Sequence, residues 1–501
     1  MRIIEGKENI ISDFLTYLQD ESKFSFGNVE YLAFPENEND ICEFLKFCSD
    51  KNIPVTISNG KTGVVGGAVP LKGALISLEK FNKILGVKKI NDEYRIYLQS
   101  GVSLDELYKF LENEKNLTEK YFYPVDVTES TAKIGGTVST NASGERSFKY
   151  GSTRNWVRSL RIVLADGNIL SIERDKVFAF NYDLEIKLSG GNIKKIKIPQ
   201  YKMPSVKNAA GYYAKENMDL IDLFIGSEGT LGIITEVELA ITKKHENIMT
   251  LLAFFPEEQN AINFFLECKK ILTSAIVFEY FDKGAFELLR PKVTNLPEDK
   301  KSAIFFETEY ADSNLEKIFS EIETLLKKNG SSMDNTWGGF EKKDVEKIRQ
   351  IRYAIPETIN ETLAKTKQKY PIIHKISADI AVPDEKFLEM FSYYKSELEL
   401  SKLQYTIFGH IGENHLHMNI LPKDNKEFLK AKELHLCFAK KAVSLGGTVS
   451  AEHGIGKIKH QYLEIMYGKD GIRQMACVKK VLDPKCILNR GNVFDEEYLD
   501  A

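Results

Sequence analysis

Three glycine-rich segments in the first 240 residues constrain the fold of this 501-residue chain more than any other feature. They are NGKTGVVGGAVP from Asn59, KIGGTVSTNASGERSFKYGSTRNW from Lys133, and LFIGSEGTLGIITEVELAI from Leu223. Glycine has no Cβ and adopts positive φ easily, so backbone N–H groups can approach a phosphate closely. Hydroxyl donors would come from Ser58, Thr62, Thr137, Ser139 and Thr140. One such loop would indicate only a turn. Three of them favour a site for a large, extended, phosphate-bearing ligand.

Several classes of function are excluded by motif and composition. Neither GxGxxG after a strand nor GxxxxGK[ST] occurs, so a Rossmann dinucleotide site and a P-loop are not expected. A net charge of -4 and a pI near 6.2 create no general attraction for nucleic acid. The six cysteines are scattered without a CxxC pair, which argues against a disulfide framework, a zinc knuckle or an iron-sulfur cluster. If the protein handles electrons, it must pass them to an acceptor outside the chain.

The N-terminus and the hydropathy pattern give an expectation for location. MRIIEGKENI lacks an apolar core, and no stretch approaches the roughly 18 apolar residues of a membrane span. A cytoplasmic protein is therefore expected, with a peripheral association with the inner membrane left open. Oligomeric state is also open, with a homodimer as one possibility.

Alternating strand and helix patterns predict two domains with sizeable cores. Residues 40–50 and 104–111 have helical spacing, the latter with Ser103 as N-cap, and IPVTIS, ALISL, YRIYLQSG and SLRIVLADG have the pattern of strands. Beyond Ala240, MTLLAFFP, SAIVFEYF and SAIFFETEY predict strands, and helices are expected over 260–272 and 315–326. The boundary between the domains is placed near Ala240.

Half of all the histidines lie in two short segments. YTIFGHIGENHLHMNILP contains His410, His415 and His417, and GGTVSAEHGIGKIK contains Glu452 and His453. From His415 the residues alternate polar and apolar, which predicts a strand with one face against a core. Gly412 to Asn414 would form a tight turn, so that the strand folds back on residues 404–410 as a hairpin.

This hairpin would bring His410 close to His417. Two imidazoles and one carboxylate make an open three-ligand site for a divalent ion such as zinc. The alternative is a solvated strand face, but such faces usually carry Lys, Glu and Thr. The segment therefore favours a metal site.

Together these segments resemble the FAD-linked 2-hydroxy-acid dehydrogenases, which include D-lactate dehydrogenase, the glycolate oxidase FAD subunit and D-2-hydroxyglutarate dehydrogenase. Most specific are PVDVTESTAKIGGTVSTNASG, GSEGTLGIITE, GHIGENHLHMN and SAEHGIGKIK. The resemblance implies an α+β fold with a vanillyl-alcohol-oxidase (PCMH) type FAD-binding domain over residues 1–240. A ferredoxin-like cap domain with an antiparallel sheet would cover 241–460, and residues 461–501 would return to the flavin.

The resemblance also implies the residues that bind FAD. Those of the first two glycine segments and the stretch between them would be Ser58, Asn59, Gly60, Lys61, Thr62, Gly63, Pro124, Asp126, Thr131, Gly135, Gly136, Thr140, Asn141 and Gly144. Adenine-side contacts would be Glu228, Gly232 and Ile233, and Asn489 would lie beside the isoalloxazine. Where relatives carry Arg-Gly-Ala-Gly, this chain has Ser-Asn-Gly-Lys, so Lys61 could supply charge to the pyrophosphate instead. The first histidine is His245, beyond all three glycine segments, so FAD would bind non-covalently.

For the chemistry, the resemblance places His410, His417 and Glu452 on a divalent metal, with zinc preferred over manganese or iron, and His453 as general base. A 2-hydroxy acid can chelate a cation, which lowers the pKa of its hydroxyl group. A neutral histidine can then take the proton, and the α-hydrogen leaves as hydride to flavin N5. The role of His415 is left open between a structural residue and one that supports the ligands.

Three residues are expected to bind the substrate. Asn419 resembles the family's substrate-contacting asparagine, and Arg352 its helix-borne arginine, whose fork suits a carboxylate. Lys375 would be a second cation, although its offset from Asp379 differs from that in the hydroxyglutarate enzymes. Pro356 stands where close relatives often place a hydroxyl.

The expected activity is oxidation of a D-2-hydroxy acid, D-lactate-like first, with a quinone, a cytochrome or a flavoprotein as the external acceptor. Two alternatives stay open. One is an FAD-dependent transferase similar to alkylglycerone-phosphate synthase, and the other is a flavin-free metal hydrolase.

Overall fold

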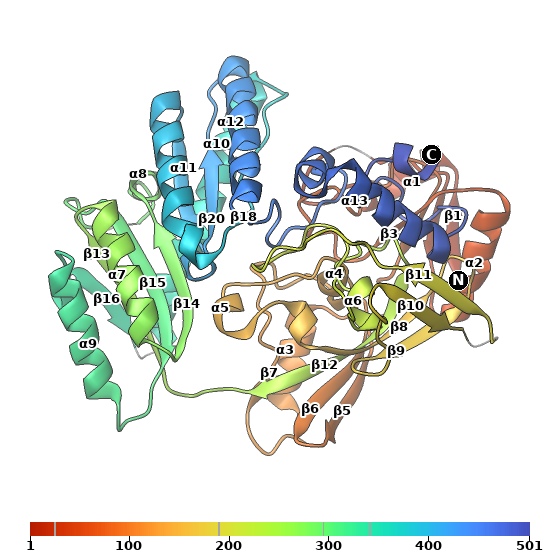
Figure 1. Cartoon of the computed structure of the whole chain (residues 1–501), viewed down its shortest axis with the longest axis horizontal. Helices are drawn as coiled ribbons and strands as arrows, with labels where there is room; N and C mark the ends of the chain where they lie inside the picture. Colours follow the sequence, from red (N-terminus) through yellow and green to blue (C-terminus); the bar gives the residue numbers. More distant parts are fainter. Residues whose placement is uncertain (25–26, 189–190, 294, 340–341, 501) are drawn as a thin grey trace.

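The computed structural model describes residues 1–24, 27–188, 191–293, 295–339 and 342–500. Figure 1 shows two lobes, and one continuous cluster of buried apolar residues includes side chains of both. The chain leaves the first lobe after β12 (Ile233–Lys243), forms the second lobe, and returns before α13 (His460–Leu482). Both chain ends therefore lie on the first lobe.

The N-terminal part of the first lobe contains a four-stranded sheet in the order β1-β2-β4-β3. Its strands are β1 (Arg2–Glu5), β2 (Tyr31–Phe34), β3 (Val55–Ser58) and β4 (Ala74–Ser77). Parallel pairing of β2 and β3 with β4 requires crossover connections. One crossover is α2 (Glu38–Asp50), which is capped by the Asn37 side chain and buries its apolar face against this sheet. The first glycine segment follows directly after β3.

The second sheet of this lobe is antiparallel, in the order β5-β6-β12-β8-β9, with β7 paired to β12. Its other strands are β5 (Ile84–Ile90), β6 (Glu93–Gln99), β7 (Tyr121–Phe122), β8 (Val157–Val163) and β9 (Ile169–Glu173). Helix α3 (Leu104–Asn113) follows β6 and begins with a capping box between Ser103 and Glu106. The remaining elements are α1 (Lys7–Asp13), α6 (Leu220–Phe224) and the hairpin of β10 (Asp183–Lys187) and β11 (Ile193–Lys197).

The second glycine segment is not a simple loop, as the sequence suggests, because it contains α4 (Ile134–Ser139) and α5 (Ser147–Tyr150). Ile134 and Val138 are one turn apart and both buried, which gives the short α4 a face against the core. Gly135 lets this helix approach its neighbour, since a Cβ there would lie 2.6 Å from the Cβ of Ser100.

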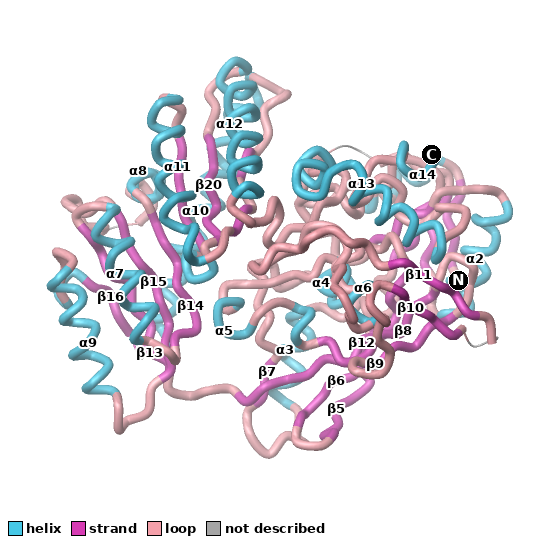
Figure 2. Tube along the Cα trace, in the orientation of Figure 1, coloured by secondary structure: helices cyan, strands magenta, loops and turns pink. Residues whose placement is uncertain are grey.

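The second lobe is built on an eight-stranded sheet in the order β16-β13-β15-β14-β19-β20-β17, with β18 also paired to β20. The strands are β13 (Ile248–Phe255), β14 (Ala275–Phe281), β15 (Ser302–Glu309), β16 (Thr336–Gly339), β17 (Ile376–Ser377), β18 (Ile380–Ala381), β19 (Tyr405–Gly409) and β20 (His415–Ile420). The helices are α7 (Glu258–Ile271), α8 (Lys283–Leu289), α9 (Leu315–Lys328), α10 (Lys342–Lys369), α11 (Phe387–Ser401) and α12 (Asn425–Ser444). In Figure 2, α7 and α9 lie in front of the strands of this sheet. The α+β class and the antiparallel cap sheet are confirmed.

The C-terminal segment packs back onto the first lobe. Helix α13 has a kink at Gly468 and is followed by α14 (Glu497–Asp500). Between them the chain runs alongside β3, where Val55 donates to Ile487 and accepts from Asn489. Of the helices in the described ranges, none has the length and apolar composition that a membrane span needs.

Candidate active site

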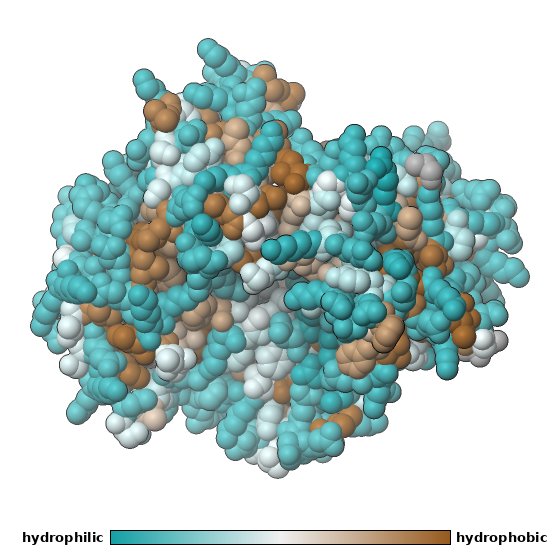
Figure 3. Space-filling view, viewed as in Figure 1, coloured by the Kyte–Doolittle hydropathy of each residue, from teal (hydrophilic) through white to brown (hydrophobic). Residues whose placement is uncertain are grey.

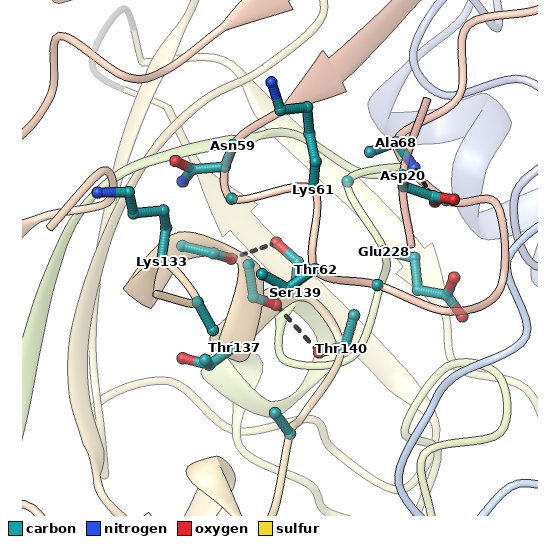
Figure 4. A pocket seen from close by; sticks show the side chains of 18 of the residues that line it. Asp20, Asn59, Lys61, Thr62, Ala68, Lys133, Thr137, Ser139, Thr140 and Glu228 are labelled. Carbon is teal, nitrogen blue, oxygen red and sulfur yellow. Dashed lines mark hydrogen bonds between the residues drawn. The ribbon is translucent and has the colours of Figure 1, made fainter. Parts of the chain in front are cut away.

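The three glycine segments line one cavity of about 350 Å³ in the first lobe. Figure 4 shows Asn59 and Thr62 from the first segment, Lys133 to Thr140 from the second, and Glu228 from the third. Glu452 and His453, which belong to the segment between α12 and α13, also line this cavity. One site therefore includes the glycine segments and the second histidine motif.

The first glycine segment presents donors to this cavity. No described residue accepts a hydrogen bond from the backbone N–H groups of residues 59 to 63, all of which line the cavity. A Cβ on Gly63 or Gly136 would project into open space. A row of free N–H groups beside open space fits the oxygens of a pyrophosphate. These residues therefore fit FAD.

Most of the predicted FAD residues line the cavity, and some do not. Those that line it are Asn59, Gly60, Lys61, Thr62, Gly63, Gly135, Gly136, Thr140, Glu228, Gly232, Ile233 and Asn489. Those outside the lining are Ser58, Pro124, Asp126, Thr131, Asn141 and Gly144.

The residues outside the lining hold the second glycine segment in shape. The carboxylate of Asp126 forms an ion pair with Arg146 at 3.4 Å. Gly144 lies so close to Asp126 that a Cβ would be 2.0 Å from its carbonyl oxygen. Asn141 accepts a hydrogen bond from the backbone N–H of Arg154 at 3.0 Å. One lining residue that sequence reasoning missed is Asp20, from the N-terminal segment.

Two charged residues of the cavity differ from expectation. The ammonium group of Lys61 lies over the Tyr17 ring, 4.0 Å from its centroid, and desolvation lowers its pKa. The carboxylate of Glu228 accepts from the backbone N–H groups of Ile455 and Gly456, each at 2.7 Å. Burial raises the pKa of Glu228 to about 7. Its carboxylate thus ties the third glycine segment to the HGIGK motif.

The predicted histidine hairpin forms between β19 and β20, with Phe408 opposite His417. Every residue of β20 is buried, because both faces of this strand are covered and not one face alone. The ligand atoms of His410, His415, His417 and Glu452 all lie within 4.8 Å of one another. His415, whose role the sequence leaves open, thus belongs to the cluster.

Neighbouring charges set the protonation of this cluster. Burial alone would lower the pKa of His410, but the charges of Glu279 and Glu452 raise it to about 9. Burial lowers the pKa of His415 to about 3 and also lowers that of His417. Burial would raise the pKa of Glu452, but the charges of Lys207 and His410 hold it well below its usual range.

Nε2 of His415 lies 3.1 Å from Asp379 Oδ1, and its Nδ1 is buried without a hydrogen bond to any described residue. Neutral imidazoles and an ionised carboxylate are ligands that divalent transition metals prefer, and His410 would release its proton on joining them. The donor set therefore fits such an ion, which His410, His417 and Glu452 would hold with His415 beside them.

His453 is held by an aspartate from another part of the second lobe. Its Nδ1 lies 3.3 Å from Asp379 Oδ2, and its side chain keeps 33% of its exposure. Asp379 lies between β17 and β18 and also accepts the backbone N–H groups of residues 451 to 453. Burial would raise the pKa of Asp379, but the charges of Lys459 and His453 hold it well below its usual range. This orients the imidazole with Nε2 on the side of Glu452, whose Oε1 lies 3.5 Å away.

Sequence reasoning missed Glu279, which contacts His410 Nδ1 from β14. Burial would raise the pKa of Glu279, but the charges of His410 and Arg352 lower it to about 2. A signal for it exists, since Glu279 interrupts the apolar run SAIVFEYF. An acid in the middle of a buried strand must have a charged partner.

The predicted substrate residues lie around the cluster but not on the cavity lining. Arg352, on α10, is 6% exposed and pairs with Glu145 at 3.1 Å and Glu279 at 3.4 Å. Lys375 directly precedes β17 and is exposed. Asn419 is buried, donates to the carbonyl of His417 at 3.2 Å, and keeps its Oδ1 without a described partner.

Comparisons with known proteins agree with this architecture. Residues 29–173 match the family described as "FAD binding domain", and residues 244–493 match "FAD linked oxidases, C-terminal domain". D-lactate dehydrogenase of Anaerostipes hadrus is 29% identical over 477 residues, covering 93% of this chain and 89% of that protein. Glycolate oxidase subunit GlcD of Bacillus subtilis (strain 168) is 28% identical, covering 92% and 88%. The mitochondrial D-2-hydroxyglutarate dehydrogenase of Danio rerio is 28% identical, covering 92% and 78%.

Among solved structures, alkyldihydroxyacetonephosphate synthase superposes with a TM-score of 0.64 and 16% identity, covering 97% of this chain and 81% of that one. At this identity the likeness shows a common fold alone. The two family matches, the relatives along nearly the whole chain and the cavity lead to one conclusion: this chain belongs to the FAD-linked 2-hydroxy-acid dehydrogenase family.

Proposed function

We propose that this protein oxidises a D-2-hydroxy acid, D-lactate-like first, to the 2-oxo acid, with FAD and a divalent metal, preferably zinc. The observation that carries the proposal is that Glu452 and His453 line the same cavity as the glycine segments. The groups that would hold a phosphate-bearing cofactor and those that would activate a hydroxyl thus share one continuous site. An external quinone, cytochrome or flavoprotein would reoxidise the enzyme.

The residues have separate tasks in this proposal. FAD would supply the hydride acceptor and the metal a Lewis acid. His453 would take the hydroxyl proton at Nε2, since Asp379 holds its Nδ1. Asn419 keeps a free Oδ1 close to His417 and would orient the substrate. Arg352 and Lys375 would provide positive charge for its carboxylate.

The named relatives support the substrate class. They are a D-lactate dehydrogenase, a glycolate oxidase subunit and a D-2-hydroxyglutarate dehydrogenase, whose names share a 2-hydroxy acid. The transferase alternative has a structural neighbour of the same fold, but its identity of 16% supports no activity. The match to an FAD-binding family argues against a flavin-free hydrolase.

The first test is anaerobic mixing of the FAD-loaded protein with single 2-hydroxy acids, followed by loss of the yellow flavin band. D-lactate or a close analogue should bleach the wild type, and His453→Ala should slow bleaching by about 10² to 10⁴ while FAD stays bound. Bleaching by His453→Ala at the wild-type rate would refute its role as base.

The second test removes the metal. Dialysis against a chelator should slow flavin reduction, because the substrate hydroxyl loses the cation that acidifies it, and added Zn²⁺ should restore the rate. The FAD absorbance of the treated protein is the control for intact folding. Full activity after the metal content falls to zero would remove the ion from the mechanism.

A further inference from the structure

A buried lysine of the first lobe reaches the histidine cluster. Lys207 lies in the loop between β11 and α6, and its side chain keeps 5% of its exposure. Its Nζ lies 3.0 Å from Glu452 Oε2, 3.2 Å from Glu413 Oε2 and 3.0 Å from Ser147 Oγ. An ammonium group has three donors, so each has an acceptor here. This arrangement fixes the charge of Lys207 at one point beside the cluster.

The other acids around the cluster have their own cations. Asp379 accepts from Lys459 at 2.7 Å, and Glu279 pairs with both Arg352 and His410. Glu452 and Glu413 share Lys207, which among the described residues is the only lysine or arginine that either of them contacts. His410 lies 3.5 Å from Glu452 Oε2, but Lys207 is the cation that the two carboxylates share.

We propose that Lys207 is a positioning residue. Its ammonium group would be a fixed second positive charge beside the divalent ion of the histidine cluster. It holds Oε2 of Glu452, which also lies 3.5 Å from His410 Nε2, while Oε1 lies 3.3 Å from His417 Nε2. A divalent ion would therefore share Glu452 with Lys207, and the space between Glu413 and Glu452 is taken by an ammonium group. The inference rests on the proposed function, because it presupposes an ion at His410, His417 and Glu452.

The fixed charge has opposite effects on binding and on chemistry. An ammonium group this close repels an incoming cation, so it weakens metal binding. It also limits how far the carboxylates neutralise a bound ion, and a more positive centre acidifies a hydroxyl more strongly. Lys207 would therefore lower metal affinity while raising the rate of proton loss from the substrate.

A simpler role must be distinguished. Lys207 and Ser147 belong to the first lobe, whereas Glu413 belongs to the hairpin of the second, so the contact could serve only to join the lobes. A lysine with that task alone would affect stability. Its removal would not raise the affinity for Zn²⁺, and removal of Glu413 would not lower that affinity.

The test measures Zn²⁺ affinity of the FAD-loaded full chain by competition with a chromophoric chelator. Lys207→Met keeps the length of the side chain but removes the charge, and it should raise the affinity at least about tenfold. It should also slow flavin reduction at saturating Zn²⁺. Glu413→Gln keeps Lys207 and removes an acid, so it should lower the affinity. Lys207→Arg retains the charge and should stay near the wild type.

Opposite shifts in Lys207→Met and Glu413→Gln, at equal FAD content, would support the inference. Equal affinities in the wild type and both variants would overturn it and leave the proposed function intact. If Lys207→Met does not fold, a lower affinity in Glu413→Gln with an unchanged affinity in Lys207→Arg supports the inference, and an unchanged affinity in Glu413→Gln overturns it. A wild type that binds no Zn²⁺ would overturn both this inference and the metal in the proposed function.

Discussion

At the scale of single residues, the absence of a side chain is as important as its presence. Gly63 and Gly136 face open space in the cavity, whereas Gly135 and Gly144 allow segments to pack closely. Gly63 and Gly136 therefore leave room for the ligand, whereas Gly135 and Gly144 are required by the packing of the protein itself. Charged residues show the same division, since Glu452 faces the cavity and Glu228 binds the backbone of another segment.

Gly136 offers a direct test of the cofactor site. Gly136→Ala adds a methyl group in the space expected for FAD, and overpacking of about 1 to 3 kcal/mol should raise the Kd for FAD roughly tenfold. Gly136 lies inside α4, where Ala is the better helix former, so the flavin-free chain should unfold at the same or a higher temperature. Fluorescence titration with FAD measures the first effect and thermal unfolding the second. An unchanged Kd would mean that FAD does not occupy this part of the cavity.

At the scale of elements, helix ends and strand pairing place the polar groups. The capping box of α3 and the pairing of β19 with β20 were accessible to sequence reasoning, because their partners lie within a few residues. The N-cap of α8 is different. Asp282 accepts from Ala285 N at 2.8 Å and from Thr406 at 3.0 Å, and its Oδ2 is buried with no described partner.

This cap predicts a pH dependence of stability. Burial, and then the charge of Glu258, raise the pKa of Asp282 to about 7, above the value of about 4 for an unfolded chain. The folded protein thus binds more protons between these values, and this contribution to stability falls as pH rises from about 4 to 7. Asp282→Asn keeps the cap acceptor without the charge. It should stabilise the protein by about 1 to 3 kcal/mol at pH 8 and much less at pH 4.

Denaturant unfolding at both pH values checks this prediction. Glu287→Gln on the same helix is a suitable control, because Glu287 is an exposed acid in an i,i+4 pair with Lys283 and should have little effect. Destabilisation of Asp282→Asn at pH 8 would show that the carboxylate is needed in its charged form, and equal effects at pH 4 and pH 8 would contradict the raised pKa.

At the scale of the whole molecule, the site is assembled from segments far apart in the chain. The C-terminal segment returns to β3 and the third glycine segment, and the second lobe supplies the histidines. Polar residues cover most of the surface in Figure 3, and apolar side chains appear there in scattered groups. The contacts that join these distant segments therefore lie in the interior of the protein, around the cavity.

Asn489 is the clearest such contact. Its side chain accepts from Ile57 N and donates to the carbonyl of Glu228, both at 2.7 Å. Asn489→Ala leaves Ile57 N without its acceptor and leaves the carbonyl of Glu228 with only the 3.2 Å bond from Asn492, so it should lower the midpoint of thermal unfolding by several degrees and weaken FAD binding. Asn91→Ala is the matched control, since Asn91 is exposed and also has positive φ. If both variants lower the unfolding midpoint equally, the effect of Asn489→Ala comes from its positive-φ backbone and not from its two hydrogen bonds.

Much of the fold was predictable because its signals are local. Helix α2, strands β3, β4, β6, β13, β14 and β15, and the histidine hairpin follow from periodicity and turn residues within short windows. The two short helices of the second glycine segment were not predicted, because burial against Ser100 and its neighbours stabilises them more than their own sequence does.

What the sequence by itself determined is the set of local devices: the glycine segments that can face a phosphate, the hairpin that joins His410 to His417, and Glu452 next to His453. Only the tertiary structure decided which distant charges surround them. Lys207, Glu279 and Asp379 reach the cluster from three different segments, and no short pattern encodes those meetings. The physical reason is that a pKa or a free donor depends on burial and on charges a few ångströms away, and chain folding, rather than sequence spacing, sets those distances.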